Sequence, residues 1–113
     1  MKICMIGSGY VGLVSGACFS DLGNTVICVD INKEIINKLN KGVISIYEPG
    51  LQELVMRNLK KNRLFFSTDI SSSIKKSDVI FICVGTPTKD NKADLKYVYK
   101  VIKSIKSNIN KYK

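Results

Sequence analysis

The chain has 113 residues, of which 45% are hydrophobic, and it carries a formal net charge of +9. This length allows one hydrophobic core of modest size, and the hydrophobic content excludes an intrinsically disordered chain. No apolar run approaches the roughly 20 residues of a membrane-spanning helix. Glycines interrupt the first apolar run, which argues against an export signal. We therefore expect a globular, cytoplasmic protein without a membrane partner.

The basic residues are concentrated in the second half of the chain. Residues 57–113 contain fourteen Lys or Arg and four acidic residues, whereas residues 1–56 contain four Lys and five acidic residues. This asymmetry raises nucleic-acid binding as a hypothesis. The lysines are scattered at helix-surface spacing without interleaved aromatic residues, however, so we expect a solvated face and no nucleic-acid partner.

The four cysteines are Cys4, Cys18, Cys28 and Cys83, and the chain has no histidine. Their spacing is not that of metal ligands. We expect buried, reduced thiols and no metal site.

The first 30 residues carry the most informative motif. An apolar strand predicted over 2–6 leads into Gly7-Ser8-Gly9-Tyr10-Val11-Gly12, followed by a helix over 10–22 and a strand over 25–29. This order is typical of a dinucleotide-binding unit. The first glycine allows the tight turn, the second allows a pyrophosphate to approach the backbone, and the third allows close packing of helix on strand. The helix N-terminus then offers free N–H groups to the phosphates.

An acidic residue completes this motif. Asp30 ends the second strand, 18 residues after Gly12. A carboxylate at this position accepts hydrogen bonds from the adenosine ribose and repels a 2′-phosphate, so NAD is predicted in preference to NADP.

The rest of the chain continues the alternation of strands and helices. Periodicity predicts helices over 32–41, 49–61, 70–75 and 95–109, strands over 64–67 and 79–84, and a polar loop over 89–93. We expect Pro49 in the first turn of its helix, and Asp69 and Asp94 as helix caps. The alternation predicts an α/β fold with a Rossmann-type doubly wound parallel sheet, in which strand 79–84 is covered on both faces.

A second cofactor element is predicted where strand 79–84 ends. Ligands of such sheets bind outside the carboxyl ends of the strands. There Gly85 allows close backbone approach, Thr86 offers a hydroxyl group, and Pro87 fixes the turn. We expect this segment beside the glycine loop, near the diphosphate or the nicotinamide ribose.

Six segments resemble the UDP-glucose/GDP-mannose dehydrogenase family, and within it the UDP-glucose 6-dehydrogenases. The most specific is Ile46-Tyr47-Glu48-Pro49-Gly50-Leu51, because GDP-mannose-type relatives usually carry a variant without the tyrosine. The resemblance covers the whole chain through residues 7–13, 29–30, 46–51, 64–68, 85–89 and 93–97.

The resemblance implies a set of cofactor contacts. The loop from Gly7 to Gly12, including Ser8, would hold the pyrophosphate, with backbone contacts from Tyr10 and Val11. Asp30 would hold the adenosine ribose. The residues lining the cofactor beyond the ribose would be Val84, Gly85, Thr86, Pro87 and Thr88.

Two positions depart from the family pattern. Before Ile46 the family usually has proline, and this chain has Ser45. Five residues after the acid the family usually has Lys or Arg at the adenosine end of the cofactor, and this chain has Ile35. Lys33 and Lys38 are the candidate substitutes.

The resemblance also implies an activity. Members oxidise the C6 hydroxyl of UDP-glucose to a carboxylate in two NAD-dependent steps, and the UDP-glucuronate formed feeds polysaccharide synthesis. A catalytic cysteine and a UDP-sugar domain would lie beyond residue 113, and none of the four cysteines here matches the catalytic one in context. Full-length members are expected to be homo-oligomers.

We therefore expect residues 1–113 to be an incomplete N-terminal NAD-binding domain, truncated before the second half of its sheet. It contains no catalytic residue and is expected to be inactive alone. Two alternatives stay open. One is another nucleotide-sugar 6-dehydrogenase, acting on GDP-mannose or a UDP-N-acetylhexosamine. The other is a stand-alone nucleotide-binding module without catalysis.

Overall fold

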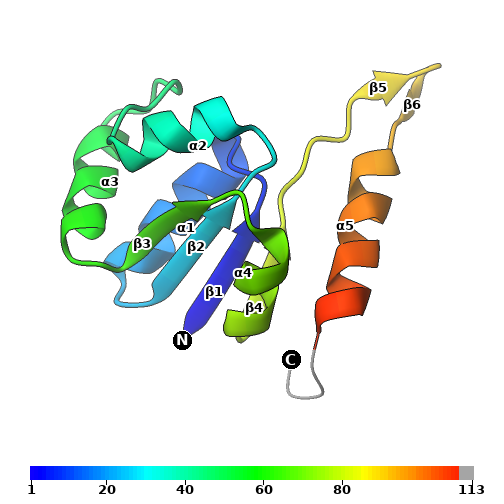
Figure 1. The fold of residues 1–113 in the computed structure, drawn as a ribbon. Helices are drawn as coiled ribbons and strands as arrows, with labels where there is room; N and C mark the ends of the chain where they lie inside the picture. Colours follow the sequence, from blue (N-terminus) through cyan, green and yellow to red (C-terminus); the bar gives the residue numbers. More distant parts are fainter. Residues whose placement is uncertain (110–113) are drawn as a thin grey trace.

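A computed structural model describes residues 1–109 and shows strands and helices alternating along the chain (Figure 1). The predicted elements are present, with ends that differ by one or two residues, as is usual at helix and strand termini. In chain order the elements are β1 (Lys2–Ile6), α1 (Tyr10–Asp21), β2 (Thr25–Val29), α2 (Lys33–Asn40), α3 (Leu51–Lys60), β3 (Leu64–Ser67), α4 (Ile70–Lys76), β4 (Val79–Ile82), β5 (Thr88–Lys89), β6 (Lys92–Ala93) and α5 (Lys96–Asn108).

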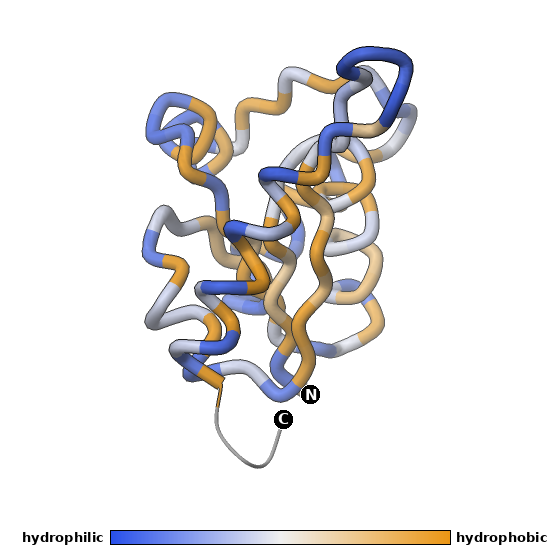
Figure 2. Tube along the Cα trace, turned by 90° about the vertical axis from the view of Figure 1, so that its right-hand side faces the viewer, coloured by the Kyte–Doolittle hydropathy of each residue, from blue (hydrophilic) through white to orange (hydrophobic). Residues whose placement is uncertain are grey.

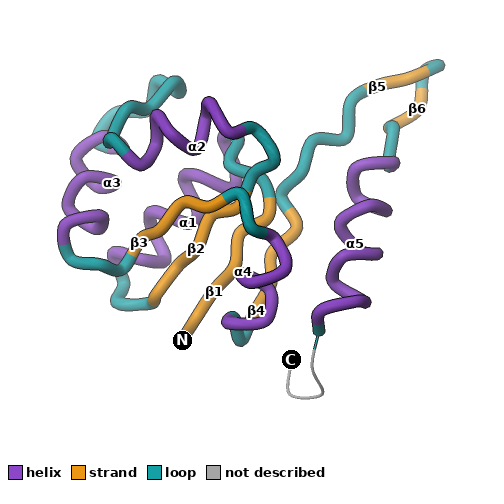
Figure 3. Tube along the Cα trace, in the orientation of Figure 1, coloured by secondary structure: helices purple, strands orange, loops and turns teal. Residues whose placement is uncertain are grey.

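The four longer strands form one parallel sheet in the order β3-β2-β1-β4 (Figure 3). In its register Ile6 lies opposite Val29 on one side and Ile82 on the other, so three strands end at the same level. The chain moves outward from β1 to β3 and then crosses to the far side of β1. This reversal of strand order confirms the doubly wound topology.

Alternate residues of β1 enter two different hydrophobic clusters. Ile3 and Met5 face α1, α2 and α3, whereas Cys4 and Ile6 face α4 and α5. Figure 2 shows the hydrophobic residues concentrated along the strands, as expected for a sheet with helices on both sides. We call the first side the α1–α3 face and the second the α4–α5 face.

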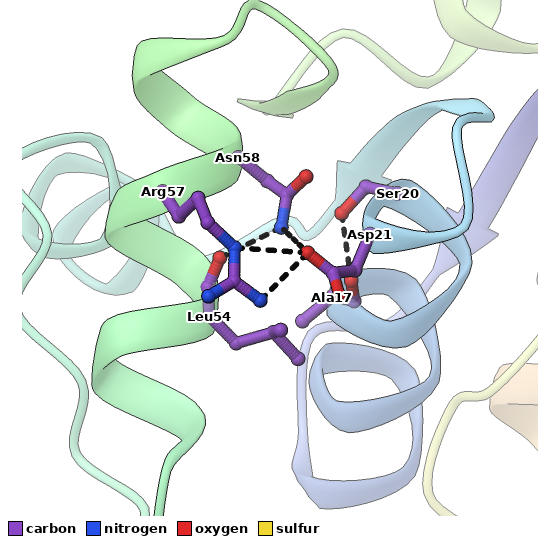
Figure 4. A network of polar contacts seen from close by, with 6 residues as sticks. All are labelled: Ala17, Ser20, Asp21, Leu54, Arg57 and Asn58. Carbon is purple, nitrogen blue, oxygen red and sulfur yellow. Dashed lines mark hydrogen bonds and ion pairs between the residues drawn. The ribbon is translucent and has the colours of Figure 1, made fainter.

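A polar cluster ties α1 to α3 at the far end of the α1–α3 face (Figure 4). Asp21 Oδ1 accepts hydrogen bonds from Arg57 Nε at 3.0 Å, from Arg57 Nη2 at 2.8 Å and from Asn58 Nδ2 at 3.1 Å. The hydrogen bonds from Arg57, and then the one from Asn58, hold the pKa of Asp21 below its usual range. Two helices far apart in sequence are thereby joined at one carboxylate oxygen.

The predicted place of Pro49 in a helix is wrong, because α3 begins two residues later. Leu51 N donates to the Glu48 carbonyl at 3.1 Å, which closes a tight turn over residues 48–51. Gly50 has φ 82° and ψ −10°, the values that the third residue of a type II turn requires. Pro49 and Gly50 therefore form the centre of a turn. Because Gly50 has a left-handed backbone conformation, the helix cannot begin before Leu51.

The polar loop predicted over 89–93 is also wrong, because these residues form part of the hairpin of β5 and β6. Thr88 pairs with Ala93 and Lys89 with Lys92, and the turn residues Asp90 and Asn91 both have positive φ. Asp and Asn tolerate this conformation better than other side chains, so two adjacent left-handed residues reverse the chain.

The predictions for the two helix caps and for the burial of strand 79–84 are confirmed only in part. Asp69 caps α4 by accepting from Ser72 N at 3.0 Å, as predicted. The cap residue of α5 is Leu95, with the carboxylate of Asp94 accepting from Lys96 N instead. Strand β4 ends at Ile82 and not at residue 84, and its last side chains are 38–39% exposed. The expectation of cover on both faces therefore fails at this end of β4.

Candidate dinucleotide-binding site

A cleft of about 710 Å³ lies at the switch point, where β1 and β4 end side by side. Its floor is formed by the ends of β1 and β2 and the segment after β4, and its far wall by α5. Open parallel sheets bind ligands at this position, because chains leaving two neighbouring strands there diverge to opposite faces.

The glycine loop is fixed by backbone contacts that leave no space for side chains at its first and last glycines. Gly7 has φ 106°, and a Cβ there would lie 2.6 Å from the Cys83 carbonyl oxygen. A Cβ on Gly12 would lie 1.9 Å from the Gly7 carbonyl oxygen. The loop therefore packs against β4 on one side and against its own helix on the other.

The middle glycine differs from these two. Gly9 lines the cleft, and a Cβ built on it would meet nothing within 4 Å. It is also the N-cap residue of α1, and no side chain caps this helix. The first N–H groups of α1 and the helix dipole are thus available to an anion beside an open cradle. This is the geometry that a dinucleotide diphosphate requires.

Asp30 connects the glycine loop to the start of α2. Its Oδ2 accepts hydrogen bonds from Ser8 N and Ser8 Oγ, both at 3.0 Å, and its Oδ1 accepts from Asn32 N at 3.0 Å. Asp30 lines the cleft, whereas Ser8 is buried beneath it. The carboxylate is held in place at the cleft wall, and its oxygens can accept further hydrogen bonds beyond these three.

The start of α1 is also bonded to the segment that carries the Tyr-Glu-Pro-Gly sequence. Tyr10 Oη donates to Glu48 Oε2 at 2.6 Å, and this hydrogen bond raises the pKa of Tyr10 above its usual value. Tyr47 next to it is 92% exposed. The most specific segment of the sequence thus lies against the phosphate-binding end of α1.

The structure brings most of the expected cofactor contacts together in one cleft. Those lining it are Gly7, Gly9, Asp30, Val84, Gly85, Thr86 and Pro87. The others do not line it: Ser8, Tyr10, Val11, Gly12 and Thr88. Tyr10 and Val11 begin α1, so their contribution would come through backbone N–H groups, and Thr88 has already entered the hairpin.

Sequence reasoning missed several residues of the cleft. Ile31 and Ile70 line it beside Asp30, and α5 adds Tyr97, Lys100 and Val101. Ile31 directly follows the acid, and its 87% exposure became visible only in the structure. The residues of α5 carry no signal in the sequence, since their place opposite the glycine loop depends on packing between distant helices.

The two lysines considered as substitutes at position 35 do not line the cleft. Lys38 Nζ lies 3.5 Å from Glu34 Oε1, an ion pair within α2. Ile35 packs against the hydrophobic cluster of the α1–α3 face. At position 35 itself α2 therefore places an apolar side chain against the core and offers no cation.

The thiols are free, and their environments differ. Cys4 and Cys28 are buried, Cys83 lies at the cleft floor, and Cys18 is exposed, so the expectation of burial is wrong for Cys18. Burial raises the pKa of Cys4 to about 11 and also raises the pKa of Cys28 and Cys83. These three thiols are protonated at neutral pH and are poor nucleophiles.

Within residues 1–109 no three Cys, Asp or Glu side chains form a group that could hold a metal ion. The helices described there are too short or too polar to cross a membrane.

The parallel sheet, the glycine loop, the acid after β2 and the cleft at the switch point define a dinucleotide-binding domain of the Rossmann type. Comparison with known proteins identifies the family to which this domain belongs. The family described as "UDP-glucose/GDP-mannose dehydrogenase family, NAD binding domain" matches residues 1–113, and the chain belongs to this family. Its cofactor is accordingly NAD.

Individual members of this family are similar to this chain in sequence and in structure. UDP-glucose 6-dehydrogenase TuaD of Bacillus subtilis is 53% identical over 113 residues, covering 99% of this chain and 24% of the relative. A GDP-mannose dehydrogenase structure from Pseudomonas aeruginosa superposes with a TM-score of 0.93 at 41% identity, covering 98% of this chain and 26% of that one. UDP-N-acetyl-mannosamine dehydrogenase Cap5O from Staphylococcus aureus gives 0.88 at 38%, covering 96% and 26%. The chain spans about a quarter of the length of these relatives.

Proposed function

We propose that this chain binds NAD in the cleft between the glycine loop and α5, and that it is the cofactor-binding portion of a UDP-glucose 6-dehydrogenase. The observation that carries the proposal is the open position at Gly9, between the uncapped start of α1 and the carboxylate of Asp30. The first N–H groups of α1 would hold the diphosphate. Asp30 would hold the adenosine ribose, and residues 84–87 would line the path toward the nicotinamide.

The complete enzyme would convert UDP-glucose, two NAD and water into UDP-glucuronate and two NADH. NAD, when bound, supplies the acceptor for hydride. UDP-glucose is favoured over other sugars by the 53% identity to a UDP-glucose 6-dehydrogenase and by Tyr47 in its specific segment. A GDP-mannose or UDP-N-acetylhexosamine substrate is the competing assignment, because dehydrogenases of both kinds share the fold.

The share of this chain in the reaction would be binding and orientation, without covalent catalysis. Cys4, Cys28 and Cys83 have raised pKa values, and Cys18 does not line the cleft. We infer that residues 1–113 form an incomplete N-terminal domain that requires a UDP-sugar domain for activity. The complete enzyme is proposed to be a cytoplasmic homo-oligomer that supplies UDP-glucuronate for polysaccharide synthesis.

Titration with NADH tests the cofactor site, with the fluorescence of the bound nicotinamide as the readout. Gly9→Val should abolish binding, because its side chain fills the phosphate position. Asp30→Ala should weaken binding by about 1–3 kcal/mol through loss of charge-assisted hydrogen bonds. Unchanged affinity in both variants would refute the assignment of the site.

An activity assay tests the division of labour. The 113-residue chain should form no NADH from NAD and UDP-glucose, whereas the complete dehydrogenase should do so and should prefer UDP-glucose to GDP-mannose and UDP-N-acetylmannosamine. Turnover by the 113-residue chain would contradict the proposal, and a preference for another sugar would replace the proposed substrate.

A further inference from the structure

One wall of the cleft comes from α5, and it presents a basic side chain. Tyr97, Lys100 and Val101 are spaced three and four residues apart, so they lie on one side of the helix, and all three line the cleft. Val101 is buried against the α4–α5 face, which fixes the helix beside the sheet. Lys100 is exposed and faces the same space as the glycine loop and Asp30.

Lys100 is free to meet a ligand. Among the cleft-lining residues in the described part of the chain, it is the one with a basic side chain. Within residues 1–109 no carboxylate lies within ion-pairing distance of Lys100, whereas Lys38 pairs with Glu34 and Arg57 pairs with Asp21. The carboxylate of Asp30 is instead bonded to Ser8 and Asn32.

The charges in the cleft show why a cation is needed. The dinucleotide brings two negative charges on its diphosphate, and Asp30 adds a third. The start of α1 supplies the equivalent of about half a positive charge. Without another cation the cleft would hold an excess of negative charge in a partly enclosed space, which weakens the binding of an anion.

We propose that Lys100 is a cationic contact of the dinucleotide's phosphates, reaching them from the wall opposite α1. The inference rests on the proposed cofactor site and extends it. A lysine side chain has a flexible four-carbon stem and a compact ammonium group, which suits a charge contact across a cleft. Ile35 on α2 packs against the core, and Lys100 is the basic side chain that the described cleft lining offers.

Affinity measurements on the full chain test the proposal with three probes: NADH, ADP-ribose and adenosine. Lys100→Met removes the charge and keeps most of the apolar stem. It should weaken NADH and ADP-ribose about tenfold, as expected for a charge-assisted contact. The affinity for adenosine, which has no phosphate, should be unchanged. Binding of ADP-ribose should also become less sensitive to salt, because one screened ionic contact is lost.

Two variants separate this role from general effects of charge and folding. Lys103→Met makes the same change on the same helix at an exposed position that does not line the cleft, and it should leave all three affinities unchanged. Lys100→Arg should retain most of the affinity for ADP-ribose.

Other results would overturn the proposal. Equal weakening of adenosine and ADP-ribose by Lys100→Met would show a packing role, and equal effects of Lys100→Met and Lys103→Met would show a diffuse charge effect. Unchanged affinities in Lys100→Met would refute the contact while leaving the cofactor site intact. Absence of binding of all three probes by the unsubstituted chain would refute the cofactor site and the contact together.

Discussion

The two faces of the sheet differ in how completely they are packed. On the α1–α3 face, three helices share one large cluster with β1, β2 and β3, and Asp21 joins α1 to α3. On the α4–α5 face the cluster is smaller, and α5 contributes Val101 as its buried residue. Ile102, the next residue of α5, is 47% exposed.

The nucleotide cleft is placed between these two kinds of structure. Its glycine loop belongs to the well-packed part, and its outer wall is the sparsely packed α5. Segments with few buried apolar contacts open at a lower free-energy cost than the core does. A ligand that touches both parts is therefore expected to stabilise the weaker one most, because binding to the folded state adds to its stability.

The largest effect is expected at the last glycine of the loop. Gly12→Ala places a methyl group 1.9 Å from the Gly7 carbonyl oxygen, a backbone atom that cannot move without shifting β1 or α1. We expect a loss of at least about 3 kcal/mol in the free energy of unfolding, measured by chemical denaturation. Gly9→Ala is the matched control, because its methyl group meets no atom within 4 Å and should cost less than about 1 kcal/mol.

The burial of Cys4 in the α4–α5 face can be tested by measuring stability at alkaline pH. The folded state raises the pKa of this thiol from 9.0 to about 11 by burial, so the unfolded chain loses its proton first as the pH rises. The contribution to stability is complete below pH 9 and is lost as the pH approaches 11. Between pH 9 and 11 the free energy of unfolding of the unsubstituted chain should therefore fall by about 2 kcal/mol more than that of Cys4→Ala, as measured by chemical denaturation. Parallel pH profiles of the two proteins would show that the pKa of this thiol is the same in the folded and the unfolded chain.

The smallest expected effect is the difference in the free energy of unfolding between two valine substitutions, one on each face. Val55 is fully buried on α3, whereas Val101 on α5 is 7% exposed beside the cleft. Removing two methyl groups should cost about 2 kcal/mol for Val55→Ala and about 1 kcal/mol for Val101→Ala, because the second site is less enclosed. Equal losses in the free energy of unfolding would mean that the two faces are packed alike. With NADH at saturation the loss for Val101→Ala should grow toward that for Val55→Ala, since only Val101 lines the cleft and its replacement weakens the stabilisation by the ligand.

The parts that could be predicted from sequence are those specified by local chemistry. The turn at Gly7, the position of Asp30 after β2 and the cap at Asp69 each follow from residues a few positions apart. The alternation of apolar strands and amphipathic helices then gives the sheet, because parallel strands need helical crossovers.

The parts that could not be predicted depend on competing local signals or on distant packing. Pro49 suits both a first helical turn and a type II turn, and Gly50 decided for the turn. Residues 88–93 are too short and too polar to show a strand pattern. The position of Lys100 in the cleft follows from how α5 lies against the sheet, which no periodicity within α5 contains.

The hydrogen bonds of Asp30 link its proposed role in cofactor preference to the architecture of the loop. The same Oδ2 atom accepts from both the backbone and the hydroxyl group of Ser8, and Oδ1 begins the turn into α2. Deleting this carboxylate to admit a 2′-phosphate would release three donors as well as remove a charge. With Asp30 in its proposed role at the ribose, engineering this domain to accept NADP would require a redesigned loop with replacement acceptors for Ser8 and Asn32, since one side chain would set both coenzyme selectivity and loop shape.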